Sequence, residues 1–136
     1  DVRSSGAGYL ATRFKISVPR KGSAFALMPS TSDANVYQDE FVNWLDTQFP
    51  MARHDATRTI FYCLDNEPDL WSGTTAGLHP MPATYAEMAS KSIALATAIK
   101  AVVPEALVFG PVSYGWAGYE NLQGASDAMG RNFHDF

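Results

Sequence analysis

Hydrophobic and polar positions follow two different periods in the first third of the chain. Between residues 11 and 18, the apolar residues Phe14, Ile16 and Val18 alternate with polar ones, which predicts a half-exposed strand. Residues 19–32 are rich in turn formers and predict an irregular connection. Apolar residues then recur at helical spacing, which predicts an amphipathic helix with Ser32 or Asp33 as its cap. These helical positions are Tyr37, Phe41, Trp44 and Leu45.

The middle of the chain has the pattern of a strand, a helix and a second strand. Residues 59–64 and 106–112 are apolar without polar interruption, which is typical of strands covered on both faces. Between them, Thr84 and Glu87 form a T-x-x-E capping box, an apolar stripe follows, and Pro104 ends the helical pattern. This order predicts a parallel βαβ unit with a right-handed crossover, and therefore an α/β fold.

Composition excludes several classes of function. The chain has 136 residues, is 46% hydrophobic and carries a formal net charge of −4, which suits one folded core. The absence of a Lys- and Arg-rich cluster argues against nucleic-acid binding. Apolar runs are too short to cross a membrane. The one cysteine, Cys63, has no partner for an internal disulfide and is expected in the core. Because the chain starts at Asp1 without Met, we expect residues 1–136 to be a fragment of one larger domain.

The two connections of the βαβ unit differ greatly in length. The helix joins the second strand through Pro104 and Glu105 alone, whereas the first strand joins the helix through residues 65–83. Long loops are usually functional, and parallel α/β proteins form their sites at the carboxyl ends of strands. We therefore expect a site at the end where Asn66 and Glu67 follow the first strand.

The residues at this end suit carbohydrate chemistry. Glycoside cleavage requires a carboxylic acid that protonates the departing oxygen and a second carboxylate that attacks or activates water. Glu67 can supply the first, and the Asn66 amide can bond a sugar hydroxyl. Flat aromatic side chains that can stack on sugar rings lie on the loops after the two strands. They are Trp71, Tyr114, Trp116 and Tyr119.

Simpler interpretations stay open at this stage. An acid after a strand can be only a loop residue, and a loop tryptophan can plug a loop rather than bind a ligand. His54, His79 and His134 lack metal-ligand spacing, and neither a G-x-S-x-G elbow nor a glycine-rich phosphate loop is present. We expect no metal and no cofactor.

Several separated blocks of the chain resemble glycoside hydrolase family 44. The blocks, in order, read VYQDEFVNWL, FYCLDNEPDLW and YAEMASKSIALATAIKAVVPEALVFGPVSYGW. The similarity runs from about Phe14 to Tyr119. It is more specific than the N-E-P triplet, which many retaining glycosidases share.

The resemblance implies a (β/α)8 TIM barrel with an accompanying β-rich domain, acting on internal β-1,4-glucosidic bonds with retention of configuration. It implies that Glu67 is the general acid/base and that Asn66 binds the sugar beside the cleaved bond. It also places Tyr114 in the cleft, and the nucleophilic glutamate on a later strand beyond Phe136. A complete barrel takes about 250 residues. We therefore expect this chain to hold about three of its strands and to be inactive alone.

One departure from the family pattern affects substrate contacts. Where the family has a histidine-rich HTHPRIHP-like loop, this chain reads SGTTAGLHP, which keeps His79 but loses an earlier histidine. The predicted substrate-binding residues are Asn66, Trp71, His79, Tyr114 and Trp116. The resemblance further implies a polymeric β-1,4-glucan as partner, a monomer when complete, and an extracellular location. The alternatives are a noncatalytic carbohydrate-binding or structural domain, or another barrel glycosidase such as a mannanase or xylanase.

Overall fold

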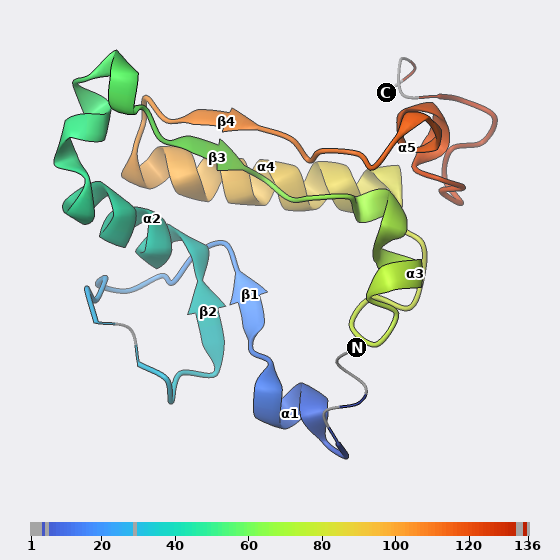
Figure 1. Cartoon of the computed structure of the whole chain (residues 1–136), viewed down its shortest axis with the longest axis horizontal. Coiled ribbons are helices and arrows are strands. Elements are labelled where there is room, and N and C mark those ends of the chain that lie inside the picture. Colours follow the sequence, from blue (N-terminus) through green and yellow to red (C-terminus); the bar gives the residue numbers. More distant parts are fainter. Residues whose placement is uncertain (1–3, 5, 29, 133–134, 136) are drawn as a thin grey trace. The chain divides into compact units, whose positions relative to one another are not determined.

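The computed structural model describes residues 4, 6–28, 30–132 and 135 (Figure 1). It divides into two compact units. The first unit contains Asp1–Tyr9, Cys63–Ile93 and Phe109–Phe136, and the second contains Leu10–Tyr62 and Ala94–Val108. The helices and strands are α1 (Tyr9–Arg13), β1 (Ile16–Val18), β2 (Asn35–Tyr37), α2 (Gln38–Gln48), η2 (Pro50–Arg53), η3 (Ala56–Arg58), β3 (Phe61–Cys63), η4 (Pro68–Leu70), α3 (Trp71–Thr74), α4 (Tyr85–Val102), β4 (Leu107–Phe109) and α5 (Trp116–Asn121).

The strand predicted over residues 11–18 is only partly correct. Residues 9–13 form helix α1, and the strand is confined to β1, which pairs in parallel with β2 from Ile16↔Asn35 to Val18↔Tyr37. A strand persists only where its backbone finds a partner, and β2 is just 3 residues long. Because Ile16 is exposed, the alternating pattern does not mark a buried face here.

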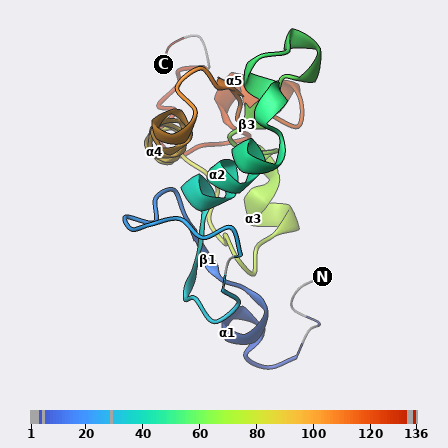
Figure 2. The ribbon, with the colours of Figure 1, turned by 90° about the vertical axis from the view of Figure 1, so that its left-hand side faces the viewer.

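Helix α2 is confirmed, but its start and its buried side differ from the prediction. The N-cap is Tyr37, which makes no side-chain capping bond, so neither Ser32 nor Asp33 is the cap. Helix α2 belongs to the second unit, as does β1; both are labelled in Figure 2. Phe41 on the predicted apolar stripe is exposed and stacks on Trp44, with ring centroids 6.1 Å apart.

The buried residues of α2 are instead Val42 and two acids, Asp39 and Glu40. The carboxylate of Asp39 accepts hydrogen bonds from the backbone N–H of Lys21 at 3.0 Å. Glu40 accepts the Ala26 backbone N–H at 2.6 Å and pairs with the Lys21 ammonium group. These hydrogen bonds, the one from Lys21 above all, hold the pKa of Glu40 below its ordinary value. The acids thus tie the connection after β1 to α2.

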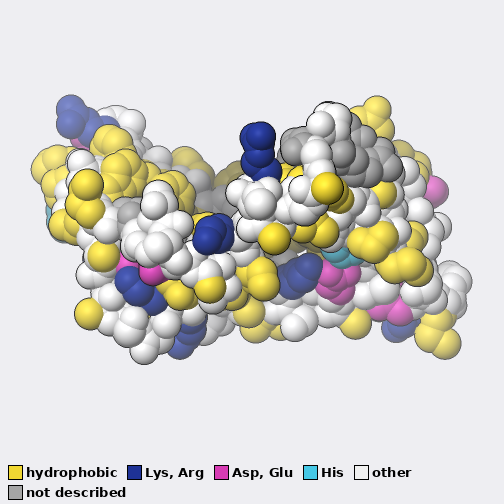
Figure 3. All heavy atoms as spheres, turned by 90° about the horizontal axis from the view of Figure 1, so that it is seen from below, with side chains coloured by type: hydrophobic (Ala, Val, Ile, Leu, Met, Phe, Trp, Pro, Cys, Tyr) yellow, Lys and Arg dark blue, Asp and Glu magenta, His cyan; other side chains and the backbone are white. Residues whose placement is uncertain are grey.

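The predicted βαβ unit is confirmed as β3, α4 and β4. The two strands are neighbours in one sheet, and Figure 1 shows their arrows running in the same direction. However, the prediction that these strands are covered on both faces is wrong for the described residues. Tyr62 is buried, whereas Phe61, Cys63 and Phe109 are exposed, so one face of the pair is open and Cys63 is not a core residue. Large apolar side chains also reach the surface elsewhere, as Figure 3 shows on one face.

The first turn of α4 is held by side chains from two places in the chain. The Glu87 N–H donates to the Thr84 hydroxyl at 3.1 Å, which confirms one half of the predicted capping box. The N–H groups of Tyr85 and Ala86 donate to the carboxylate of Asp127, at 3.0 and 2.9 Å. These N–H groups have no partners within the helix, so Asp127 completes its N-terminus.

The first unit has a small apolar core beside the N-terminal part of α4. Trp71 packs against it from its edge. Its buried members are Ala83, Tyr85, Met88, Leu122, Ala125 and Ala128. The described residues form two separate two-stranded parallel sheets and no closed barrel. No helix among the described residues is long and apolar enough to span a membrane.

Candidate active site

The backbone pairing of β3 and β4 continues beyond the strands and ends at Glu67. Val112 donates to the Asp65 carbonyl at 3.1 Å, and Glu67 donates to the Val112 carbonyl at 2.6 Å. Between these bonds, Asn66 and Val112 form a parallel bridge. Glu67 therefore lies at the carboxyl end of the strand pair on a backbone fixed by the neighbouring strand, as the sequence predicted.

The backbone of Glu67 is strained. Its φ and ψ angles are 49° and 51°, the left-handed region, which costs a non-glycine residue about 1–2 kcal/mol. Pro68 begins η4 directly afterwards, and the Leu70 N–H donates to the Glu67 carbonyl at 2.9 Å. Strained residues persist where surrounding bonds hold them, and they concentrate at active sites. The Glu67 side chain is half-buried, and none of the ion pairs among the described residues includes it.

Asn66 and Trp71 are joined by a hydrogen bond. The indole Nε1 of Trp71 donates to the Asn66 backbone carbonyl at 3.1 Å, while the Asn66 side chain is exposed beside Glu67. The Trp71 ring is half-buried, with the Lys91 ammonium 5.5 Å from its centroid and the His79 ring edge-on at 5.2 Å. Trp71 is thus a fixed part of the wall that supports Asn66.

His79 is bonded on both ring nitrogens. Nδ1 lies 2.7 Å from the Met81 carbonyl, and Nε2 lies 2.9 Å from a carboxylate oxygen of Glu87, which also pairs with Lys91. Burial raises the pKa of the Glu87 carboxyl, but the hydrogen bonds from Lys91 and His79 outweigh it and hold this pKa below its ordinary value. These contacts fix the loop before α4, so His79 supports Trp71 in the described structure.

The predicted aromatic residues after β4 are exposed. The side chain of Tyr114 is 66% exposed, and that of Trp116, at the start of α5, is 77% exposed. Tyr119 also reaches the surface. The exposed faces of Tyr114 and Trp116 can stack on a sugar ring. Together with Asn66 and Glu67, they belong to the first unit, which brings together the ends of both strands.

Two residues that sequence reasoning missed hold this arrangement. Asp69 is 6% exposed, and its carboxylate accepts the Tyr114 N–H. Asp127 bonds the N-terminus of α4. Asp69 stands directly after the N-E-P triplet, and its position there is the only sequence signal that marks it. Nothing local to Asp127 indicates its partner.

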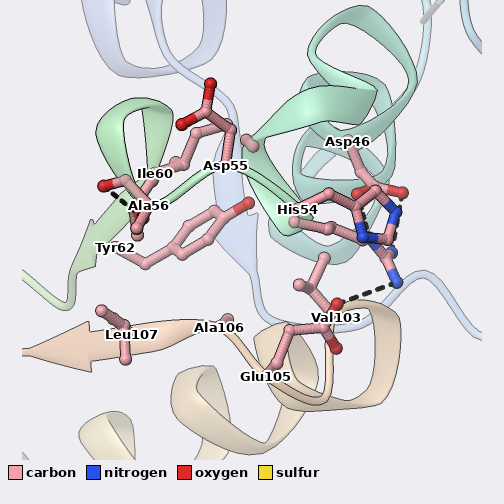
Figure 4. Close-up of a pocket in the computed structure, with 13 residues that line it drawn as sticks. Asp46, His54, Asp55, Ala56, Ile60, Tyr62, Val103, Glu105, Ala106 and Leu107 are labelled. Atoms are coloured by element: carbon pink, nitrogen blue, oxygen red, sulfur yellow. Dashed lines mark hydrogen bonds and ion pairs between the residues drawn. The ribbon is translucent and has the colours of Figure 1, made fainter.

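A second polar cluster lies before the two strands, not after them. A pocket of about 380 Å³ lies in the second unit, and its lining residues are drawn in Figure 4. Here Arg53 bonds Asp46 and reaches Glu105 at 3.4 Å. Burial, with a further contribution from Asp46, raises the pKa of Tyr62 in its wall. Because its charges are paired with one another and lie at the amino ends of the strands, this pocket is structural.

The described residues contain no group of three or more His, Cys, Asp and Glu side chains that could hold a metal ion. His134, one of the three histidines, lies outside the described residues.

The model for glycoside hydrolase family 44 matches residues 2–136. The chain belongs to glycoside hydrolase family 44. This family 44 chain is 44% identical over 108 residues to a β-mannanase/endoglucanase A of Caldicellulosiruptor saccharolyticus, a match that covers 79% of this chain and 8% of that protein. It is also 44% identical over 105 residues to endoglucanase A of Paenibacillus lautus, covering 77% of this chain and 15% of that protein.

Solved structures agree with this family 44 assignment. A family 44 endoglucanase of Clostridium thermocellum superposes with a TM-score of 0.83 at 43% identity, over 91% of this chain and 25% of that chain. A Paenibacillus polymyxa xyloglucanase, solved with xyloglucan, gives a TM-score of 0.78 at 37% identity, over 88% of this chain and 24% of that chain. The family 44 chain therefore spans a quarter or less of the length of each of these relatives.

Proposed function

We propose that this chain is part of a retaining endo-β-1,4-glucanase with a (β/α)8 barrel, in which Glu67 is the general acid/base. The observation that carries the proposal is the position of Glu67. In a family 44 chain, it follows a parallel strand at the carboxyl end, in a left-handed backbone conformation that a bond to Val112 maintains. Strain held at a carboxylate in this place supports a role in chemistry rather than in loop solubility.

The reaction proceeds in two displacements. In the first, the Glu67 carboxyl donates its proton to the glycosidic oxygen as the bond to the anomeric carbon breaks and a second carboxylate attacks that carbon. In the second, the Glu67 carboxylate takes a proton from water as the water oxygen displaces the enzyme carboxylate. The second carboxylate belongs to the part of the domain outside residues 1–136. Asn66, beside Glu67, bonds a hydroxyl of the sugar at the cleaved bond.

The polymer is held by aromatic side chains on the loops that follow β3 and β4. Tyr114 and Trp116 offer exposed faces for stacking. Trp71 holds the backbone of Asn66, because its indole N–H donates to the Asn66 carbonyl. His79 acts through Trp71, which it contacts edge-on. A β-1,4-glucan such as cellulose or xyloglucan fits this set. The names of two relatives, an endoglucanase and a xyloglucanase, support the same class. A third relative is named β-mannanase/endoglucanase A, so mannan is tested alongside.

The decisive experiment replaces Glu67 by Gln in the complete domain that contains this chain. Removing the general acid is expected to lower kcat/KM on carboxymethylcellulose and xyloglucan by about 10²-fold or more. The matched control is Glu105→Gln, which removes one carboxylate at the amino end of β4 and keeps near-normal activity, because exposed ion pairs contribute about 0–1 kcal/mol. Equal activity of Glu67→Gln and Glu105→Gln would refute the assignment.

Two further measurements define the reaction. Proton NMR of the first product formed from a soluble cello-oligosaccharide is expected to show the β-anomer, and an initial α-anomer would exclude a retaining mechanism. Parallel assays on xylan and mannan decide between a glucanase and another barrel glycosidase. Binding of a glucan by the complete domain without any hydrolysis would instead favour a noncatalytic carbohydrate-binding domain.

We propose an extracellular location on the same basis, because a polymeric glucan does not enter a cell. The enzyme is expected as a monomer in the culture fluid of its source. Size-exclusion chromatography with light scattering tests whether the enzyme is a monomer. Immunodetection in cell and medium fractions tests whether it is extracellular.

A further inference from the structure

Asp69 is a buried carboxylate at an unusual place, two residues after the proposed acid/base. It is 6% exposed, and both carboxylate oxygens lie near the Tyr114 backbone nitrogen, at 3.2 and 3.3 Å. Burying a carboxylate is costly unless hydrogen bonds compensate. The donor here is the backbone N–H of Tyr114, a residue that is itself 66% exposed. The buried acid therefore fixes the residue that presents an aromatic face to the substrate.

Gly118 in α5 provides the space for this carboxylate. A Cβ at Gly118 would lie 2.5 Å from Oδ2 of Asp69, 2.9 Å from its Cγ and 2.8 Å from the Ser113 Cβ. The glycine is buried within the helix, where it costs roughly 1 kcal/mol relative to alanine. Its backbone angle is not in the left-handed region, so space alone requires the glycine. The helix thus carries an unfavourable residue that leaves room for Asp69.

Two bonds link the loop after β3 to the loop after β4. One runs from the Glu67 N–H to the Val112 carbonyl at 2.6 Å, and the other runs from the Tyr114 N–H to Asp69. Each loop contributes two anchor residues separated by a single residue. The two bonds close a small ring made of backbone and the Asp69 side chain. This ring contains both Glu67, the proposed proton donor, and Tyr114, the proposed sugar-stacking residue. Within this ring, the position of Tyr114 relative to Glu67 depends on Asp69.

We propose that Asp69 is a positioning residue that sets the Tyr114 ring against the sugar whose glycosidic oxygen Glu67 protonates. This inference rests on the proposed function of Glu67. Asp69 does not touch the substrate. It acts through the Tyr114 backbone, with Gly118 as the residue that admits it.

The test is a double-mutant cycle in the complete domain, with Asp69→Ala, Tyr114→Ala and the two together. Misplacing a binding group by about 1 Å can cost up to 10²-fold, so we expect Asp69→Ala to lower kcat/KM on xyloglucan by about 10-fold or more. If Asp69 acts through Tyr114, the double variant has the same kcat/KM as Tyr114→Ala. If the two losses multiply, as for independent sites, the proposal is overturned.

A second pair of variants separates positioning from packing. Gly118→Ala is expected to lower both thermal stability and activity, because its Cβ meets Asp69. In Asp69→Ala/Gly118→Ala the contact with the Asp69 carboxylate is removed while the contact with the Ser113 Cβ remains, so the melting temperature recovers only in part and kcat/KM stays low. Recovery of normal kcat/KM in this double variant would show that Asp69 only fills space, and would also overturn the proposal.

Two controls keep the outcome decisive. If Asp69→Ala does not fold, Asp69→Ser serves in its place, since a serine hydroxyl on a shorter side chain does not reach the Tyr114 N–H. Affinity for cellotetraose, measured by calorimetry in the Glu67→Gln background, is expected to fall about 10-fold with the Asp69 change. Failure of the proposed function appears separately, as normal activity of Glu67→Gln alone.

Discussion

The carboxylate of Asp127 accepts the backbone N–H of Tyr85 at 3.0 Å, across a separation of 42 residues in the chain. The same carboxylate accepts the Ala86 N–H, and these bonds hold the pKa of Asp127 below its ordinary value, the bond from Ala86 above all. The segment after α5 is thereby joined to the start of α4. Asp127 thus caps α4, although it belongs to no sequence motif near the start of that helix.

Asp127→Ala is expected to destabilise the domain. Two N–H groups of α4 lose their acceptor, and the loss is expected to lower the melting temperature by a few degrees, about the shift of a lost helix cap. Ser126→Ala is the matched control, because the Ser126 side chain is exposed and the change should leave the melting temperature unaltered. Calorimetry on the complete domain measures both. Equal melting temperatures for the two variants would contradict the capping role.

Glu67→Gly separates the strain at Glu67 from its chemistry. Glycine adopts a φ of 49° without the steric penalty, so we expect the free energy of unfolding to rise by about 1 kcal/mol, or to be unchanged where the added chain entropy offsets the gain. Activity is expected to be lost as in Glu67→Gln. Denaturant unfolding monitored by fluorescence checks stability. A clearly less stable Glu67→Gly would show that the Glu67 side chain contributes to folding.

Acid pH is expected to weaken the contacts around Glu87. Its pKa is lowered in the folded state from an ordinary value of 4.5, so the unfolded chain takes up the proton first as pH falls. The contacts of Lys91 and His79 with the Glu87 carboxylate therefore contribute fully to folding stability above pH 4.5. This contribution is lost as pH falls through the folded pKa of Glu87. Glu87→Gln is expected to lower stability at pH 7 and to reduce its fall between about pH 5 and the folded pKa. Melting temperatures across this range test it, and parallel curves for the two proteins would contradict it.

Two glycines provide a matched pair for backbone effects near the site. Gly110 has a φ of +91°, and a Cβ there would lie 3.2 Å from the Cys63 sulfur and 3.4 Å from the Val112 nitrogen. Gly110→Ala is expected to destabilise the domain by about 1 kcal/mol or more and to lower activity, because Val112 holds Glu67. Gly73→Ala in α3 meets nothing within 4 Å and is expected to stabilise by about 0.5–1 kcal/mol. Urea unfolding of both variants distinguishes these outcomes. The same sign of change for the two would refute the argument.

Much of the site was accessible from local sequence pattern. The apolar run before Asp65 predicted a strand, and the polar residues after it predicted that Glu67 stands at the carboxyl end, which the structure confirms. The prediction that Cys63 is buried failed, because the periodicity of a run does not reveal whether both faces are covered. In the described residues, one face of β3 is open. The strand predicted over residues 11–18 was only partly correct, because its length depends on a partner, β2, that is distant in sequence.

By itself, the sequence determined the order of strand, helix and strand, the capping of α4 by Thr84, and the placement of Asn66 and Glu67 on a loop at a strand's end. These features arise from hydrophobic period and local capping, which act over a few residues. Only the tertiary structure decided that Asp69 bonds Tyr114 and that Asp127 bonds Tyr85, across 45 and 42 residues. Such contacts depend on how the chain closes in space. The sequence therefore does not reveal which groups bond a buried carboxylate, because the backbone N–H groups that compensate its burial come from distant positions in the chain.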